Sequence, residues 1–511
     1  MIVDFIFTKV PRFFAFLYRL MCESMIFGIA GKVWHAFANA CKGCFLGRLL
    51  AERKNEGEKL SNSVVIGWID GVFGFIVKIT GKILSALTFG SYSCIFTRVL
   101  AKLRELYTLL DYEFVAGVAI VFIFLCPGEL WRNVFGLGIA MLLLFTLLFT
   151  AAAKKREVMS VRRLGLAFIA FVISSFVGVG VASDKAEAIR VLIFFGTAFI
   201  MTIVIAAAIT DKEKLKKLLG FIFAAVIGTA IYGFYQRMVG VEINASLTDL
   251  STNTAMPGRV FSTFDNPNNY AEFLVLTMPL CFAYCLMQKA GWVRRISCLL
   301  SLLPVGALLM TYSRSGWVSF ALAMAVFVFF YNKKLIPVIV VAAIACIPLL
   351  PETVMARMMT IGSTSDSSNM YRIYIWEGVL RMLKDYWVSG VGLGPANFRP
   401  IYVGVCNSLA TPAPHSHMLY LELWIELGAL GIISYLGMMI SLFRRSVISL
   451  KYASKNVRTA IIAGCSGLVG VLFASAAEYI WFYPRVMITY FIVMGLVYAC
   501  INIAYKEGNA K

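Results

Sequence analysis

VFGLGIAMLLLFTLLFTAAA, residues 134–153, runs for twenty residues without a charge and is followed at once by KKREVMSVRR, residues 154–163. At 1.5 Å per residue, a helix of this length measures about 30 Å, which is the thickness of the hydrocarbon core of a bilayer. Because lipid offers no hydrogen-bond partners, an isolated apolar segment can satisfy its backbone only as a helix. The stretch therefore predicts a membrane-spanning helix that ends at a strongly basic loop.

The composition of the whole chain agrees with this prediction. Of its 511 residues, 60% are hydrophobic and 14% are charged, which excludes an ordinary soluble enzyme. The formal net charge of +20 would also suit a nucleic-acid-binding protein. Membrane proteins, however, gather Lys and Arg in their cytoplasmic loops, so we expect these charges to face membrane lipids and expect no nucleic-acid partner.

Twelve apolar stretches of spanning or nearly spanning length follow one another from Glu113 onward. Each must be helical in lipid, so the expected fold is an all-α, polytopic bundle of about twelve transmembrane helices. The stretches cover approximately residues 114–130, 134–153, 164–182, 188–209, 216–236, 271–288, 296–312, 316–331, 335–350, 418–443, 457–480 and 485–504.

The connections between these stretches alternate in charge. Every second one is rich in Lys and Arg, and the others carry few such residues. The positive-inside rule places the basic connections and both termini in the cytoplasm and the remaining connections outside. Two external loops, 237–270 and 351–417, are far longer than a helix connection needs, which is typical of functional loops. The second contains an amphipathic segment at 371–387, which we expect to rest on the membrane or to cap a cavity.

Residues 1–112 differ from the rest because charges interrupt their apolar segments, and residues 51–63 form a polar linker. We expect this region to be amphipathic, cytoplasmic and associated with the membrane surface, with 64–89 as a further candidate span. The transmembrane domain is then expected to cover 113–505.

Two of the three histidines, His415 and His417, end the second external loop just ahead of an apolar helix. A neutral imidazole can accept a proton from an attacking hydroxyl, although a hydrogen-bonded structural histidine is the alternative. Histidines at positions i and i+2 do not share a helix face, so one base with one supporting residue is more natural than a metal pair. No D-x-D motif occurs, and Cys41 and Cys44 lack a second ligand pair, so we expect neither a metal nor another cofactor.

Arg259 and Arg314 lie in external segments that otherwise carry little charge. A guanidinium near the bilayer normally has an anionic partner or water, and its planar fork fits phosphate oxygens. Phosphate binding and pairing with a structural carboxylate are both open for each arginine. Nearby, Asn266 and Asn268 in the turn DNPNN either contact a polar ligand or cap the next helix.

Four stretches together resemble the O-antigen ligase and polymerase superfamily of integral membrane glycosyltransferases. The resemblance covers roughly 113–505, and the stretches agree with that family in their order and predicted side. Ser262 stands where Gly is frequent in the family, and Met418 where Asn or Ser is frequent. The four stretches are GRVFSTFDNPNNYAEF (258–273), TYSRSGW (311–317), YRIYIWEGVLRMLKDYWVSGVGLGPANF (371–398) and HSHMLYLELWIELGALG (415–431).

The resemblance implies transfer of a glycan from an undecaprenyl-diphosphate carrier to an acceptor hydroxyl at the outer face of the cytoplasmic membrane, without a nucleotide sugar or a metal. A single displacement with inversion at the anomeric carbon is expected. The expected partners are the lipid-linked donor, a glycan, lipid or protein acceptor, and other polysaccharide-assembly proteins. The implied site residues are Arg259 and Arg314 for the diphosphate, His417 and its helper His415 for catalysis, and Asn266, Asn268, Arg372 and Glu426 for substrate positioning.

A flippase for lipid-linked oligosaccharides, or another twelve-helix transporter, is the alternative function. Transporters tend to show internal repeats and broken helices at mid-membrane. No repeat relates the two halves of this sequence, and its polar residues gather in the external loops. A non-catalytic scaffold would explain neither the paired histidines nor the isolated arginines. We therefore favour catalysis.

Overall fold

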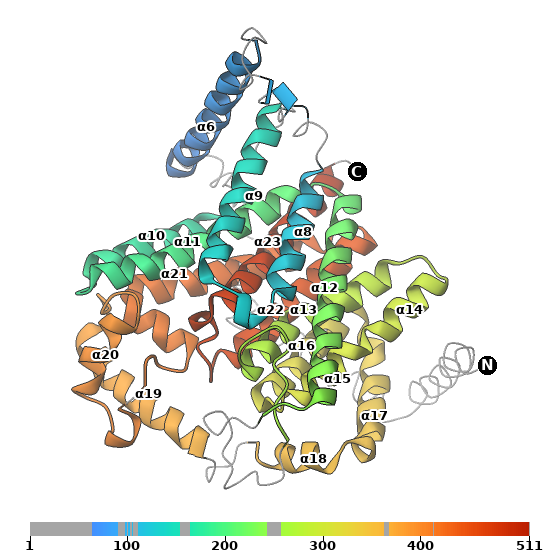
Figure 1. Cartoon of the computed structure of the whole chain (residues 1–511), viewed down its shortest axis with the longest axis vertical. Helices are drawn as coiled ribbons and strands as arrows, with labels where there is room; N and C mark the ends of the chain where they lie inside the picture. Colours follow the sequence, from blue (N-terminus) through green and yellow to red (C-terminus); the bar gives the residue numbers. More distant parts are fainter. Residues whose placement is uncertain are drawn as a thin grey trace.

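The computed structural model describes residues 64–89, 98–99, 101–102, 105, 111–153, 164–242, 257–361, 367–411 and 413–509, and among these residues it contains helices and connections but no strand. The expected surface helices of residues 1–63 lie outside the described residues. Of the N-terminal region, α6 (Val64–Phe89) is described; it lies against α9 (Asn133–Ala153) (Figure 1).

The remaining helices follow in chain order. The long ones are α8 (Tyr112–Leu125), α10 (Leu166–Val181), α11 (Lys185–Ala208), α12 (Lys212–Val239), α13 (Pro267–Met287), α16 (Arg314–Asn332), α19 (Ser367–Tyr386), α21 (Leu419–Ser449), α22 (Lys455–Ala474) and α23 (Pro484–Asn509). The shorter ones are η2 (Gly128–Leu130), α14 (Trp292–Leu300), α15 (Leu302–Met310), η4 (Lys333–Leu335), α17 (Ile336–Cys346), η5 (Ile347–Leu349), α18 (Glu352–Met359), α20 (Pro395–Val403), η6 (Ser408–Ala410) and η7 (Ile480–Phe482).

The predicted all-α, polytopic bundle is confirmed. Nine helical segments of the described chain are long and apolar enough to cross a bilayer, and α8 and α10 are shorter apolar helices. The expected stretches are largely helical, but several are shorter or less continuous than expected: α8 ends at Leu125, α22 ends at Ala474, and α21 is interrupted at Gly428. The segment from Trp292 is interrupted at Ser301, because Pro304 removes a backbone donor and crowds the carbonyl four residues earlier. Helix α17 has only 11 residues, with Pro337 at its start and Pro348 after its end.

Two helices occupy the centre of the bundle. Within the apolar segments of α23 and α13, 94% and 83% of the residues are buried, against 28% for α16. Helix α13 packs against α22, and α11 packs against α23. A helix that is apolar on all sides must be covered by other helices or by lipid, so the central pair is covered by protein and α16 faces lipid over much of its surface.

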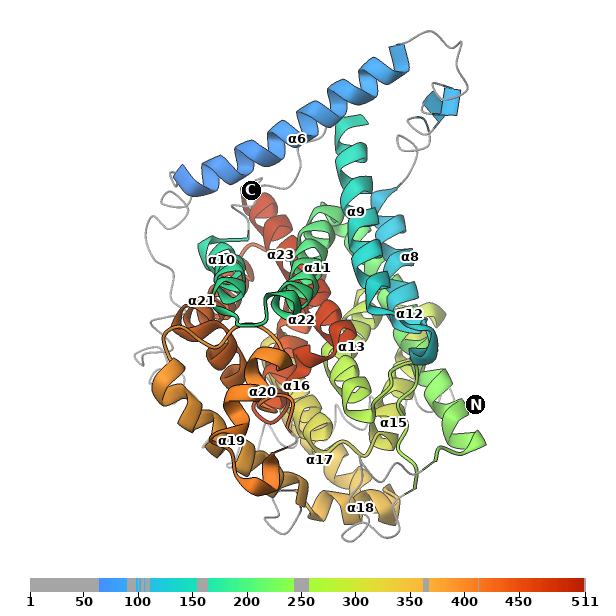
Figure 2. The same ribbon diagram turned by 60° about the vertical axis from the view of Figure 1, so that its left-hand side comes forward.

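The amphipathic helices gather at one end of the bundle. Figures 1 and 2 show α18, α19 and α20 at the end opposite the C-terminus. The start of α16 belongs to this end because Arg314 contacts Thr360 directly after α18, and the start of α21 belongs to it because the loop after α20 leads into α21. The two long loops that the sequence assigns to the outside therefore meet at one end of the molecule.

A break in α21 anchors the helices at this end of the bundle. Gly428 has a φ of 66°, which interrupts the helix. The freed carbonyl groups of Ile425 and Glu426 accept hydrogen bonds from the amides of Val391 (2.7 Å) and Gly392 (3.0 Å). The turn after α19 thus supplies hydrogen bonds to the carbonyl groups that the break leaves without helical partners. This inserted turn fixes α19 against α21.

Candidate active site

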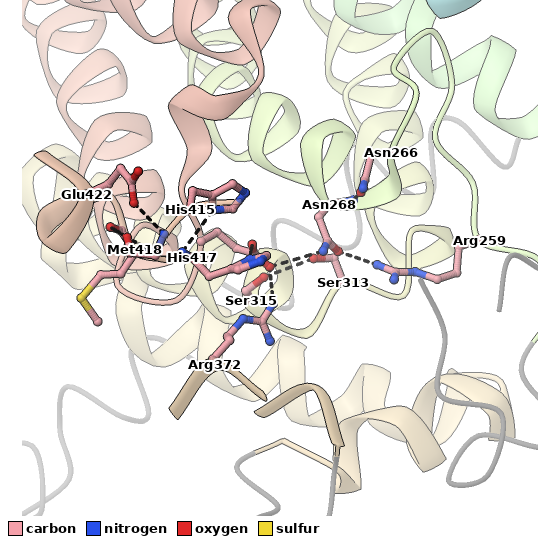
Figure 3. Close-up of polar contacts among 12 residues, drawn as sticks. Arg259, Asn266, Asn268, Ser313, Ser315, Arg372, His415, His417, Met418 and Glu422 are labelled. Atoms are coloured by element: carbon pink, nitrogen blue, oxygen red, sulfur yellow. Dashed lines mark hydrogen bonds and ion pairs between the residues drawn. The ribbon is translucent and has the colours of Figure 1, made fainter. Parts of the chain in front are cut away.

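Arg259 lies in the connection between α12 and α13 and is 8% exposed. Its Nε donates a hydrogen bond to the carbonyl oxygen of Thr311 (2.8 Å), and its Nη2 donates to Oδ1 of Asn268 (2.5 Å). The amide of Val260 donates to the carbonyl oxygen of Met310 (3.0 Å), which joins this connection to the end of α15. Two of the residues that the sequence singled out, Arg259 and Asn268, are therefore in direct contact (Figure 3).

A second buried arginine holds the same connection in place. Arg485, at the start of α23, donates from Nη1 to the carbonyl oxygens of Cys126 (3.0 Å) and Thr263 (2.6 Å). Its guanidinium carbon lies 4.5 Å from the ring centre of Trp131 and 5.0 Å from that of Phe264. Arg485 is not among the site residues predicted from the sequence. Its position directly after the helix-starting Pro484 was the available signal.

Arg314 is the first residue of α16, after the N-cap Ser313. Its Nη1 donates to the carbonyl oxygen (2.9 Å) and to Oγ1 (3.2 Å) of Thr360, the residue that ends α18. The arginine therefore joins the start of a membrane helix to the amphipathic α18, which carries the buried Arg357. Sequence reasoning did not single out Arg357, because nothing local distinguishes it from other charges in the long external loop.

The arginines form an electropositive cluster. Burial and, to a smaller extent, the positive charges of Arg357, Arg314 and Arg372 together lower the pKa of the Arg259 guanidinium to about 9, although the charge of Glu478 opposes the shift. With a pKa of about 9, Arg259 still carries its charge at neutral pH. A cluster of like charges in a buried setting is stabilised by an anionic ligand.

Glu478 connects the arginine cluster to the histidines. Its Oε1 forms an ion pair with Nη2 of Arg372 and accepts a hydrogen bond from Nδ2 of Asn268 (3.4 Å). Its Oε2 lies 3.7 Å from Nδ1 of His417. Burial alone would raise the pKa of the Glu478 carboxyl, but Arg372, His417 and His415 outweigh it and lower the pKa to about 2. Figure 3 shows Arg372, Asn268 and His417 side by side in this region.

Sequence reasoning missed Glu478 because it lies within the apolar stretch 457–480, which we expected to be one helix. The helix α22 ends at Ala474, and the amide of Leu419 donates to the carbonyl oxygens of Ser475 (3.0 Å) and Glu478 (3.3 Å). The turn that carries the carboxylate therefore stacks on the start of α21, next to His417. A single acidic residue near the end of an apolar run was the only signal in the sequence.

The two histidines have different surroundings. His415 is 5% exposed, its ring centre lies 4.4 Å from that of Phe482, and its Nδ1 accepts a hydrogen bond from the backbone amide of His417 (3.1 Å). Burial, aided by His417 and opposed by Glu478, lowers the pKa of the His415 imidazole to about 3. His415 is thus neutral at physiological pH and supports the backbone. The His417 side chain is 26% exposed and faces the carboxylate.

Backbone strain marks the same region. The non-glycine residues with positive φ in the described chain are Ser262 (53°), Tyr312 (51°) and His417 (52°). Each such residue costs about 1–3 kcal/mol and persists only where its surroundings enforce it. Ser262 follows Arg259, Tyr312 precedes Arg314, and the third is the candidate base. Ser262 adopts a left-handed backbone that glycine would accept without strain.

Two predicted positioning residues have structural contacts. Asn266 caps α13, because its side chain accepts a hydrogen bond from the amide of Asn268 (2.8 Å). Glu426 is 1% exposed, and it accepts hydrogen bonds from the amide of Gly394 (2.8 Å) and the hydroxyl of Tyr479 (3.4 Å). Neither has a hydrogen bond to the arginine cluster or to the histidines among the contacts described, and their substrate roles stay predictions.

Part of this site lies in a region that is similar to a known family. The model of a family described as O-antigen ligase matches residues 299–436. Over 268 residues the chain is 23% identical to a ComP-specific O-oligosaccharyltransferase from Acinetobacter baylyi, and this match covers 49% of the chain and 46% of that protein. The chain therefore aligns with about half the length of this curated relative. The family match includes Arg314, Arg372 and His417, whereas Arg259 and Glu478 lie outside it.

Proposed function

Because the chain belongs to the O-antigen ligase superfamily, we propose that this membrane glycan transferase uses an undecaprenyl-diphosphate-linked glycan as its donor. It transfers the glycan to an acceptor hydroxyl at the outer face of the cytoplasmic membrane, as a polysaccharide polymerase or ligase. One observation carries this proposal: Arg259 and Asn268 are joined through Glu478 to Arg372 and His417, although these residues are far apart in the sequence.

The arginine cluster fits the leaving group. When the bond between the anomeric carbon and the diphosphate oxygen breaks, negative charge develops on the phosphate oxygens. Guanidiniums that are already in place stabilise this charge more in the transition state than in the ground state. Loss of one such group typically costs about 3 kcal/mol, or about a hundredfold in rate. Arg259 and Arg314 are the residues that we assign to the diphosphate.

His417 is suited to the role of general base. Its Nδ1 faces the Glu478 carboxylate at 3.7 Å, which favours the tautomer with the proton on Nδ1 and leaves Nε2 as the basic nitrogen. A distance of this kind is longer than a hydrogen bond and commonly shortens when substrate binds. The carboxylate then stabilises the imidazolium that forms during the reaction.

The reaction is a single displacement. The acceptor oxygen attacks the anomeric carbon, its proton passes to Nε2 of His417, and the carbon–oxygen bond to the diphosphate breaks with its electron pair on the leaving group. Attack opposite the leaving group inverts the anomeric carbon. The proton then leaves His417 for solvent or for the released undecaprenyl diphosphate. Asn268 and Arg372 keep the Glu478 carboxylate oriented.

The acceptor belongs to one of three classes: another glycan, a lipid core or a protein hydroxyl. The purified full-length chain in liposomes, supplied with an undecaprenyl-diphosphate-linked glycan and each acceptor in turn, tests the proposal. We expect the carrier to lose its glycan to one acceptor and undecaprenyl diphosphate to accumulate. If the glycan stays on its carrier and only changes leaflet, the protein is a flippase and the proposal is wrong.

A further inference from the structure

An apolar cavity lies in the half of the bundle remote from the active site. Its volume is about 340 Å³. Its one hydroxyl, that of Ser446, is already satisfied, because it donates a hydrogen bond to the carbonyl oxygen of Leu442 (2.8 Å). The lining includes Val326 and Phe330 of α16, Ile440 and Phe443 of α21, and Cys465 and Val469 of α22.

The helices around this cavity are those that build the active site. Arg314 begins α16, His417 lies two residues before the first residue of α21, and Glu478 follows the end of α22. At 1.5 Å per residue, Val326 and Phe330 lie about 18 and 24 Å along α16 from Arg314. Since the hydrocarbon core of a bilayer is about 30 Å thick, the cavity lies in the leaflet opposite the site.

A row of partly exposed apolar residues on α22 connects the cavity with the active site. Most residues of this helix are buried by α13, α16 and α23. Cys465, Val469 and Leu472 are partly exposed, and Phe473 is 50% exposed. Their spacing of three and four residues puts them on one face of the helix. An apolar strip therefore leads from the cavity toward the end of α22 that precedes Glu478.

We propose that this cavity binds the far end of the polyprenyl tail of the donor, an inference that rests on the proposed function. When the diphosphate of the donor is bound at Arg259 and Arg314, its undecaprenyl chain is long enough to follow the apolar strip into the cavity. A farnesyl chain is too short to do so. An apolar cavity of roughly 150 Å³ stays dry and holds a benzene-sized group. The present cavity has roughly twice that volume, so it accommodates roughly two isoprenoid units.

The cavity makes the enzyme prefer donors with a long polyprenyl carrier. Since bilayer lipid is as apolar as the cavity, the tail gains packing contacts there but little from the hydrophobic effect. We therefore expect a modest preference, about tenfold in kcat/KM, for the undecaprenyl over the farnesyl carrier of the same glycan. A phospholipid chain that fills the cavity would give no such preference.

Two variants fill the cavity from different walls: Val469→Trp on α22 and Ile440→Trp on α21. The matched control is Leu142→Trp on α9, where the side chain is 54% exposed and the helix contributes no residue to the cavity lining. Transfer is measured in liposomes with the undecaprenyl-linked and the farnesyl-linked donor. Transfer from the farnesyl-linked donor reports correct folding, because this chain does not reach the cavity.

We expect each cavity-filling variant to lose the preference while transfer from the farnesyl-linked donor stays within about twofold of wild type, and the control to keep the preference. If either variant keeps the wild-type ratio, the cavity does not bind the tail, although the proposed function stands. If the wild-type protein transfers from neither carrier, the proposed function fails and this inference fails with it.

Discussion

Replacing Glu478 with glutamine removes one negative charge while it keeps the size of the side chain and its contact with Asn268. At 3.7 Å, the carboxylate and a protonated His417 interact by about 4 kcal/mol at an effective dielectric constant near 20. Arg372 shares the same carboxylate, and His417 is 26% exposed, so we expect about half of this energy to stabilise the transition state. A loss of about 2 kcal/mol is a decrease of about thirtyfold in kcat.

The assay is transfer in liposomes under single-turnover conditions, together with equilibrium binding of the donor. Because the substitution removes a negative charge from among the arginines, donor binding should be unchanged or tighter, although kcat falls. Glu507→Gln is the matched control, since Glu507 is also ion-paired, with Lys212, at the opposite end of the bundle. Weaker donor binding at an unchanged kcat would refute a role for Glu478 in stabilising the protonated histidine.

Four further outcomes are expected. Arg314→Lys keeps the charge but loses the planar fork, so kcat/KM should fall substantially, toward the roughly hundredfold loss of Arg314→Gln; a variant as active as wild type contradicts diphosphate binding by Arg314. His415→Asn retains an acceptor for the amide of His417 and should keep most activity, with a pH–rate profile unchanged above pH 4, whereas His415→Leu should lose it; equal activities would contradict this support role. Pyrophosphate should raise the Tm of wild type more than that of Arg259→Gln, and an equal rise would place the anion elsewhere. The pKa of Glu478 is lowered from 4.5 to about 2, so its ion pairs stabilise the fold above pH 4.5 and are lost as the pH falls toward 2; the difference in Tm from Glu478→Gln should shrink over this range, and a constant difference would contradict it.

The sequence predicts much of the fold because lipid leaves few alternatives. Twenty uncharged residues at 134–153 must be helical in a bilayer, and the same argument identifies every other stretch. Helix ends are less predictable, because composition alone does not say where a helix stops. Pro304 and Pro348 are visible in the sequence, but whether they kink or end a helix depends on how the neighbouring segments cover the freed backbone groups.

The candidate site was predictable only in part. Histidine is rare enough in the whole sequence to stand out, Arg372 and Asn268 entered through the family resemblance, and the structure brings His417 and Arg372 together with Asn268. Glu478 could not be assigned to them, because its partner residues come from loops far away in the chain. The role of Gly428 was also hidden, since the break that it introduces in α21 is stabilised by backbone groups of a turn nearly forty residues earlier.

The most direct test of the account is the substitution His417→Ala, with donor binding and transfer measured on the same purified protein in liposomes. If the arginines hold the diphosphate and His417 accepts the proton of the acceptor, the variant binds the undecaprenyl-linked donor as wild type does and transfers no glycan. Transfer at the wild-type rate would contradict the assignment of the base and, with it, the proposed mechanism.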